Sequence, residues 1–241
     1  MGHELEAPWG EHGPDWNLLY RARGDEVSAH RPVFTGDVFG ATRVQGIPDP
    51  RERTVIIVQH PCALRTDGVD LAERLIVGEV KPARPPDRDG WRGNFGRMPL
   101  PDLRPDGSEK KRHQSAVFDN PYLVARDALD PANRIACLSQ TGVNLLLQRW
   151  VCHNSRVVVP TFQYQEVTRG QFDEADLIEE WCESRIEDGV AVDEATREAV
   201  AWLREPSVTG GRTRQALLDD PQQVSAVRQD LWRHLRALPR T

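Results

Sequence analysis

The sequence is poor in lysine and lacks several motifs of common enzymes. Lysine occurs at three positions, 81, 110 and 111, so nearly all of the 31 basic residues are arginine. Codon bias in a GC-rich genome explains this preference, so the arginine content alone does not indicate phosphate binding. There is no glycine-rich phosphate loop, serine nucleophile elbow or tandem Cys-x-x-Cys pair, which disfavours the common cofactor-dependent enzymes.

Long apolar runs and paired cysteines are also missing. No run approaches the roughly 20 apolar residues that a membrane-spanning helix needs, and no apolar leader follows Met1. The four cysteines are scattered along the chain, at Cys62, Cys137, Cys152 and Cys182. These features predict a soluble, cytoplasmic protein with reduced thiols and no membrane contact.

Length and charge set further bounds. A chain of 241 residues with 39% hydrophobic residues accommodates one large domain, or a core domain with an appendage. The net charge of −6 argues against a protein that binds nucleic acid with its whole surface. Local basic patches remain compatible with this charge.

The central pattern is the unbroken β-prone run at 54–58, which ends in a polar cluster at Pro61. Such a run predicts a strand that is buried on both faces. Proline cannot donate to a sheet ladder, so the strand should end near Gln59 and present His60 and Cys62 at its rim. A second apolar run at 74–80 predicts the neighbouring strand.

Further strands are expected on either side of this pair. The segment 31–39 reads as a strand in which Gly36 marks a bulge or a close backbone approach. Residues 133–139 alternate, residues 117–124 suggest two short strands, and 156–160 is a last β-prone run. Between them, 82–114 is rich in proline and has no periodicity, which is typical of a long functional loop or a disordered one.

Helices are expected mainly towards the C-terminus. Ser139 or Thr141 can cap a helix over 143–151. Helical patterns then cover 173–188 and 194–205, and Asp220-Pro221 should open the last helix. The predicted organisation is α+β: an N-terminal arm at 1–30, a β core at 31–168 with the loop insertion 82–114, and a helical region at 169–241.

The strand that opens in Gly-Asp-Val-Phe at 36–39, the proline-containing loop after it and the buried strand ending in Gln-His-Pro-Cys resemble the SH3-like barrels of the MazF/PemK superfamily. The resemblance covers roughly 31–80, with weaker support from 138–156. It implies a small β-barrel, and it implies that the first strand and its loop shape an RNA-binding groove. The matching region here offers Arg43, Arg51 and Arg53, without a catalytic pair that matches residue by residue. The resemblance nevertheless implies a metal-independent endoribonuclease as one alternative function.

Two clusters suggest alternatives that use cysteine. His60 and Cys62 together with Cys152 and His153 offer zinc ligands, although their spacing is not a usual one for zinc. Cys62 with His153 would alternatively be a nucleophile and its base. The simpler interpretation makes Cys62 and Cys152 small buried apolar residues, and no resident metal is predicted.

A second alternative is a metal-dependent nuclease. Glu79 and Lys81 lie on the same face of the second strand, and Asp70 precedes it. This resembles the acidic, acidic-x-Lys pattern of PD-(D/E)xK nucleases over about a dozen residues. Two carboxylates would hold Mg²⁺ while the lysine activates water. An ion pair on the strand is the simpler explanation for Glu79 and Lys81.

The leading hypothesis is a non-catalytic binding or accessory module of a bacterial system such as phage defence or toxin–antitoxin control. It would recognise protein or nucleic acid, with a homodimer as an option. The residues expected to bind are Arg43, His60, Cys62, Arg65, Lys110, Lys111 and Arg112. A basic set near the C-terminus, Arg228, Arg233, Arg236 and Arg240 with Trp232, offers a further surface, opposed by the acidic stretch 173–198.

Overall fold

The computed structural model describes residues 4–10, 13–45, 47, 51–66, 69–93, 95–105, 107–108, 112–207 and 210–238. The chain forms two compact units. Unit 1 comprises residues 1–29 and 33–166, and unit 2 comprises residues 30–32 and 167–241. The fold is α+β, with an antiparallel sheet in unit 1 and mainly helices in unit 2. Among the described residues, no helix has the length and apolar character that crossing a bilayer requires.

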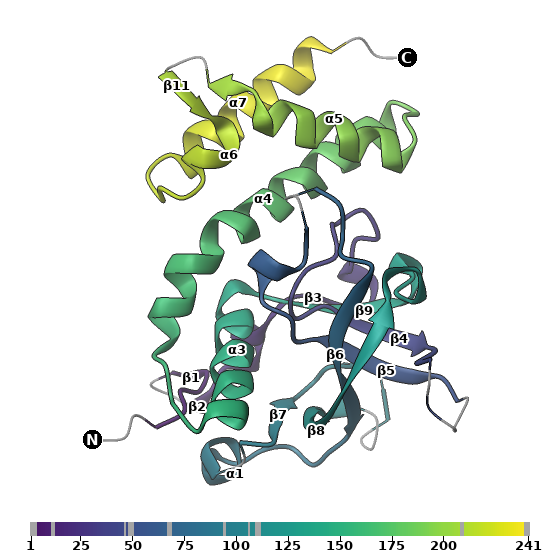
Figure 1. The fold of residues 1–241 in the computed structure, drawn as a ribbon, viewed down its shortest axis with the longest axis vertical. Helices are drawn as coiled ribbons and strands as arrows, with labels where there is room; N and C mark the ends of the chain where they lie inside the picture. The colour runs from purple at the N-terminus through teal and green to yellow at the C-terminus, as the bar shows by residue number, and fades with distance from the viewer. Residues whose placement is uncertain are drawn as a thin grey trace. The chain divides into compact units, whose positions relative to one another are not determined.

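Unit 1 is organised around a seven-stranded antiparallel sheet with the strand order β3-β9-β4-β5-β6-β8-β7 (Figure 1). Its strands are β3 (Tyr20–Arg23), β4 (Val38–Thr42), β5 (Arg53–Ile57), β6 (Arg74–Pro82), β7 (Arg97–Leu100), β8 (Gln114–Ala125) and β9 (Arg134–Leu138). A small hairpin of β1 (Trp9–Gly10) and β2 (Gly13–Pro14) precedes them. Short 3₁₀ turns occupy Trp16–Leu19, Gly24–Glu26, Pro61–Ala63, Arg126–Ala128 and Pro131–Asn133.

The sheet is curled into a half-barrel, and side chains tie its two edges together. The hydroxyl of Tyr20 on edge strand β3 donates to the carbonyl of Pro101, directly after edge strand β7, at 2.8 Å. Arg23 Nη1 donates to the carbonyl of Asp102 at 3.0 Å. A sheet edge leaves backbone groups without strand partners. These two hydrogen bonds give the carbonyl groups of Pro101 and Asp102 a partner and stabilise the curled shape of the sheet.

The predicted central strand is confirmed as β5. Val55, Ile56 and Ile57 are fully buried, so both faces of this strand are covered. The strand expected at 31–39 is wrong in its first part, because β4 begins at Val38 and Gly36 lies in the turn before it. The φ of Gly36 is +85°, and a Cβ placed on it would lie 2.9 Å from side-chain atoms of Leu138. No other residue type combines this φ with this space.

The helix α3 (Gln140–Ser155) packs on one face of the sheet. Ser139 is its N-cap, and the Ser139 hydroxyl accepts from Gly142 N at 3.1 Å. The N-cap is therefore Ser139 rather than Thr141. The helix contacts the sheet through Trp150, whose ring lies 5.6 Å from that of Phe118 on β8, and through Arg149, which donates to the carbonyl of Arg97 at 3.1 Å.

Several sequence-based expectations differ from the structure. The N-terminal segment includes β3, which pairs with β9 and so belongs to the sheet. The expected loop 82–114 contains α1 (Arg88–Gly93) and β7. Residues 117–124 form one strand with a register shift, and 156–160 forms no strand. For β3, β7 and β8, pairing with strands far along the chain, which sequence patterns do not report, decides the local structure.

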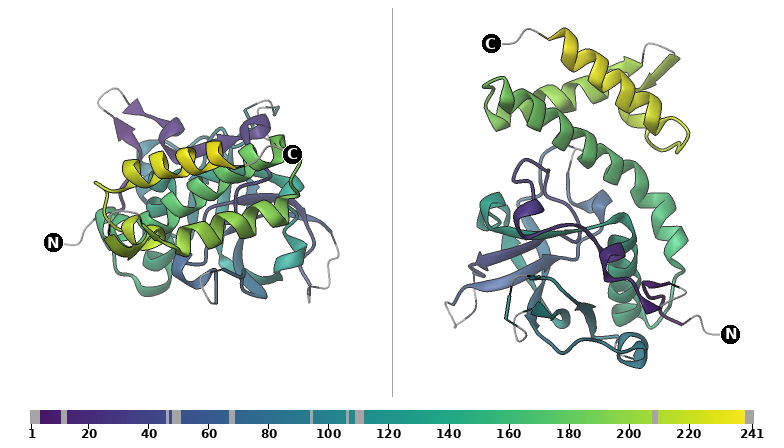
Figure 2. Two further views of the ribbon diagram at one scale, coloured as in Figure 1. Left: turned by 90° about the horizontal axis from the view of Figure 1, so that it is seen from above. Right: turned by 180° about the vertical axis from the view of Figure 1, so that it is seen from behind.

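Unit 2 contains the rest of the chain from residue 167 and the short segment 30–32. Its elements are most of α4 (Thr161–Glu187), then α5 (Val192–Arg204), the hairpin of β10 (Pro206–Ser207) and β11 (Gly210–Thr213), α6 (Arg214–Leu217) and α7 (Val224–Ala237). The last three helices gather around the C-terminal part of α4 (Figure 2). Their shared core includes Leu177, Trp181, Ala199, Trp202 and Leu231.

Three features of this part of the chain were not expected from the sequence. The helix α4 starts at Thr161, twelve residues before the helix expected at 173–188, and α7 begins at Val224, after a turn that contains Asp220 and Pro221. Arg31 is almost fully buried beside α4, where it pairs with Asp176 and, at 3.0 Å, with Glu179. Two of the acidic side chains of α4 thus form ion pairs inside unit 2.

Candidate functional site

The site of interest lies where β5 begins and β6 ends. Val55 on β5 pairs with Glu79 on the antiparallel strand β6. Arg53 lies two residues before Val55 and Lys81 two residues after Glu79, so their side chains lie on the same face of the sheet. The centres of β5 and β6 are apolar and buried, whereas the adjacent ends of the two strands carry the charged side chains of Arg53, Glu79 and Lys81.

Glu79 is the centre of a cluster with Arg51, Arg53, Lys81 and Tyr122, called here the Glu79 cluster. One carboxylate oxygen, Oε1, lies 3.7 Å from Arg53 Nε and 3.9 Å from Arg51 Nη2. The other, Oε2, lies 3.2 Å from Lys81 Nζ and accepts a hydrogen bond from the Tyr122 hydroxyl at 3.3 Å. Both oxygens thus have polar partners.

Burial makes these partners necessary. Glu79 is only 9% exposed, and removing a carboxylate from water is costly unless cations and donors replace the water. Three cations meet this one carboxylate, so the Glu79 cluster has an excess of positive charge. Arg53 is buried with Glu79, whereas the side chains of Arg51 and Lys81 are 65% and 49% exposed. The excess charge is therefore presented to solvent.

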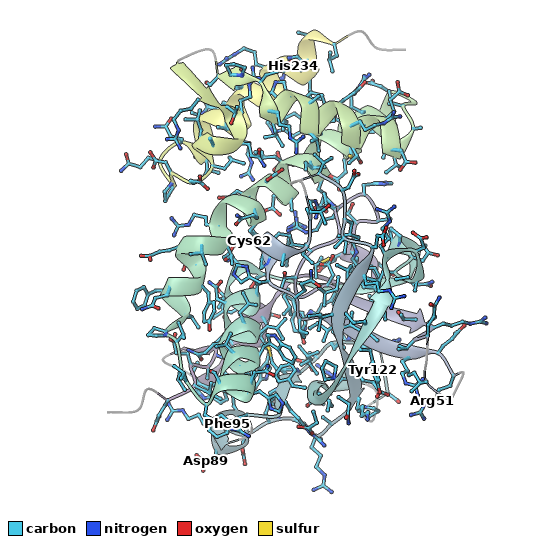
Figure 3. All side chains as sticks on the ribbon, viewed as in Figure 1. Arg51, Cys62, Asp89, Phe95, Tyr122 and His234 are labelled. Carbon is cyan, nitrogen blue, oxygen red and sulfur yellow. The ribbon has the colours of Figure 1, made fainter. Side chains whose placement is uncertain are left out.

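Tyr122 reaches Glu79 because β8 is irregular. Tyr122 faces Val77 and Val117 faces Glu79, so residues 118–121 of β8 stand opposite the single residue Gly78. A bulge of this kind re-aims side chains and often stands near functional sites. Figure 3 shows Arg51 and Tyr122 close together at this side of the sheet. The interruption at Asn120-Pro121 was the sequence signal for this irregularity.

Arg43 extends the same rim. It follows β4, whose residue Thr42 pairs with Arg53, and its side chain is 81% exposed. Arg43 Nε lies 3.6 Å from a carboxylate oxygen of Glu52, which is also exposed. Arg43, Arg51, Arg53 and Lys81 are called here the cationic rim.

The other predicted residues before β6 lie at the opposite end of the strands. His60, Cys62 and Arg65 follow the C-terminal end of β5, and Asp70 lies beside the β-bridge of Arg65 and Leu71. Arg74 begins β6, and five residues of strand separate Arg74 from Glu79 by about 17 Å. The fold therefore places Asp70 and Glu79 apart, so the geometry of β6 does not assemble them into one metal site.

The loop with His60 is held together internally. His60 Nδ1 accepts from Cys62 N at 3.3 Å, and Gln59 Oε1 accepts from Ile76 N at 3.0 Å. Burial lowers the pKa of His60, which favours the neutral imidazole that this acceptor role needs. Arg65 Nη1 donates to the carbonyl of Val33 at 3.4 Å. These side chains organise the turn after β5.

Of the basic residues predicted at 110–112, only Arg112 is among the described residues; Lys110 and Lys111 lie outside them. Arg112 Nε pairs with Asp102 at 2.5 Å, and His113 Nδ1 lies 3.6 Å from the same carboxylate. Arg112 precedes Gln114, which pairs with Pro82 at the end of β6. Arg112 thus lies near the sheet end that carries Lys81, with part of its charge balanced by Asp102.

The structure gives no support to a zinc site from His60, Cys62, Cys152 and His153. Within the described ranges, no group of three or more histidine, cysteine or acidic side chains is arranged to hold a metal ion. Cys62 is exposed, Cys152 is buried in α3, and His153 stacks on Trp150 with ring centroids 6.4 Å apart. The expectation of a small buried cysteine is therefore confirmed for Cys152 and wrong for Cys62, which lies in the exposed turn after β5.

Comparison with known protein families gives no matching family, and comparison with curated proteins gives no match either.

Proposed function

We propose that unit 1 is a non-catalytic nucleic-acid-binding module and that the cationic rim contacts the sugar-phosphate backbone. One observation carries this proposal: Glu79, buried and shared by three cations, fixes Arg53 and Lys81 while Arg51 and Lys81 expose their charged heads. Arginine and lysine side chains that are held in position in this way can bind phosphate oxygens, and such contacts do not depend on the base sequence of the nucleic acid. A local rim of this kind is compatible with the overall net charge of −6.

The finer fold assignment belongs to the same proposal. The curled antiparallel sheet and the bond between its edges support an SH3-like barrel similar to the MazF/PemK superfamily. In such a barrel the region corresponding to Arg43, Arg51 and Arg53 borders the nucleic-acid groove. A protein partner is the competing possibility for the same rim, and an acidic peptide in the binding assay distinguishes the two.

The test is fluorescence anisotropy with labelled single-stranded RNA, single-stranded DNA and an acidic peptide at low salt. The double variant Arg51→Ala with Lys81→Ala should bind nucleic acid about tenfold more weakly or worse, because fewer counterions are released when fewer phosphates are neutralised. A matched control removes Arg74 and Arg126, which lie at the opposite end of β6. Equal weakening in both double variants, or binding of the peptide alone, would refute the proposal.

A second candidate function, a metal-independent endoribonuclease, is favoured by the same carboxylate. Glu79 would accept the proton of a ribose 2′-hydroxyl as its oxygen attacks phosphorus. Arg53 would stabilise the charge on phosphorus, and the Lys81 ammonium would give its proton to the departing 5′-oxygen. The products would be a 2′,3′-cyclic phosphate and a 5′-hydroxyl. A carboxylate beside three cations is less suited to Mg²⁺, since cations repel the metal.

Incubation of single-stranded RNA in EDTA separates these candidates. Cleavage by the wild type that persists in EDTA and is lost in Glu79→Gln would favour the ribonuclease. Cleavage that needs Mg²⁺ and disappears in Asp70→Asn would restore the metal-dependent nuclease based on Asp70, Glu79 and Lys81. A folded wild type that binds RNA without cleaving it supports the non-catalytic module.

A further inference from the structure

The outer face of α7 in unit 2 has an unusual composition. The inner face of this helix contributes Val227, Leu231 and Leu235 to the core of the unit. On the outer face Trp232 remains 39% exposed. Part of a large aromatic side chain thus stays accessible to a ligand on the outer face of a helix whose inner face is already packed.

Trp232 borders a hollow of about 430 Å³, whose other lining residues are Gln229, Arg233 and Arg236. On a helix, residues three and four positions apart are neighbours. Gln229, Trp232, Arg233 and Arg236 therefore form one continuous surface, here called the α7 surface. It combines an aromatic ring with two guanidinium groups, and among the described residues no carboxylate lines it.

A second hollow of about 200 Å³ adjoins the first, since both are lined by Gln229 and Arg233. Its floor includes Arg214, which is held by Asp230 at 2.8 Å and by Glu205 at 3.2 Å. Asp230 also contacts Arg233 Nη1 at 3.2 Å, although the Arg233 side chain is 74% exposed. The carboxylates of Asp230 and Glu205 thus balance Arg214 and Arg233, and Arg236 in the first hollow adds one further positive charge.

We infer that the α7 surface binds single-stranded nucleic acid, with a base stacked on Trp232 and phosphates on Arg233 and Arg236. An exposed aromatic ring next to cations is the combination with which proteins hold unpaired bases without sequence preference. A duplex hides the faces of its bases, so the indole would contribute only to single strands. This site is separate from the cationic rim and does not depend on the function proposed for unit 1.

The experiment measures the affinity of the full chain for a labelled oligouridine, a DNA hairpin duplex and a labelled oligoglutamate peptide. Trp232→Ala should weaken oligouridine binding by about 5- to 100-fold, the range expected for one stacked base. Trp232→Phe keeps a ring and should retain most of the affinity. Arg233→Ala with Arg236→Ala should weaken binding and reduce its salt dependence. Arg197→Ala, on the exposed face of α5, is the charge control.

Each outcome decides the inference. Unchanged oligouridine binding in both Trp232→Ala and the double arginine variant would overturn it, and weakening confined to Arg51→Ala with Lys81→Ala would leave the unit 1 proposal intact. Equal binding of duplex and single strand by the chain that carries Arg51→Ala and Lys81→Ala would also overturn it. Arginine-dependent binding of oligoglutamate alone would overturn it and point to an acidic protein. A wild-type dimer that becomes monomeric in Trp232→Ala, with RNA binding unchanged, would assign the surface to a second copy of the chain.

Discussion

Glu79 connects stability and function in unit 1 at the scale of a single residue. Its carboxylate is 9% exposed and is shared by Arg51, Arg53 and Lys81. Removing the carboxylate would leave Arg53, itself buried, without the main negative charge in its surroundings. Buried charges that lose a partner destabilise proteins far more than exposed ones do.

We expect Glu79→Gln to lower the free energy of unfolding by about 3 kcal/mol, the lower end of the range typical for the removal of one partner of a buried ion pair. Urea denaturation followed by circular dichroism measures this. The matched control is Glu52→Gln, whose carboxylate pairs with the exposed Arg43 and should change stability by no more than about 0.5 kcal/mol. Equal effects of the two substitutions would mean that the Glu79 cluster is not a stabilising centre.

At this scale the sequence predicts some of the site and misses the rest. The spacing of Glu79 and Lys81 correctly places both on one face of a strand. Tyr122 is missed because its approach depends on a register shift in β8, and register shifts follow from tertiary packing rather than from local pattern. Asp70 is close to Glu79 in sequence but distant in space, because an extended strand moves residues apart at about 3.3 Å per residue.

At the scale of elements, α3 shows how one cap fixes a helix boundary. Two candidates, Ser139 and Thr141, were open in the sequence. In the structure the Ser139 hydroxyl accepts from Gly142 N and donates to the carbonyl of Leu18, so it links α3 to the segment before β3. Thr141 is exposed within the first turn of the helix.

Ser139→Ala is expected to destabilise unit 1 by about 1 kcal/mol, since it removes an N-cap. Thr141→Ala should change the free energy of unfolding by only a few tenths of a kcal/mol, because it removes no cap and alanine is a good helix former. Chemical denaturation of both variants measures the difference. A larger destabilisation by Thr141→Ala than by Ser139→Ala would contradict the cap assignment.

The helices α4 and α5 of unit 2 carry carboxylates whose pKa values shift in opposite directions. Hydrogen bonds from Arg185 hold the pKa of Glu198 below its usual range, against a smaller opposing effect of burial. Burial raises the pKa of Asp173, with a further contribution from Asp176, while Arg228 and Arg169 oppose the rise. The two groups should therefore affect stability with opposite signs of pH dependence.

For Glu198 the folded pKa is the lower one, so its stabilisation is present above the unfolded value of about 4.3 and is lost as the pH falls through the folded pKa. Glu198→Gln should thus destabilise at pH 7 and much less in acid. For Asp173 the pKa is higher in the folded state than in the unfolded state, so the folded state loses stability as the pH rises from the unfolded pKa through the folded pKa. Asp173→Asn should therefore stabilise the protein at pH 7. Thermal melts between pH 3 and 7, a range chosen around roughly these carboxyl values, measure both effects. The same pH trend in both variants would contradict the assignment.

At the scale of the whole molecule, the chain combines a half-barrel unit with a helical unit. The buried strand β5, the neighbouring β6, the close approach at Gly36 and the helical C-terminal region were predictable, because each depends on a local pattern of apolar residues or on glycine. The edge strands β3 and β7 were not, since each has only four residues. Their pairing is decided by partners far along the chain.

The central claim is that the cationic rim of unit 1 binds the phosphate backbone. The most direct measurement is the affinity for a labelled oligouridine over a range of salt concentrations, for the wild type and for Arg51→Ala with Lys81→Ala. For a single strand, the slope of log affinity against log salt becomes shallower by about 0.7 for each phosphate that is no longer neutralised, so the double variant should have a slope shallower by about 1.4. An unchanged slope and affinity in the double variant, with Arg74→Ala and Arg126→Ala behaving identically, would contradict the account.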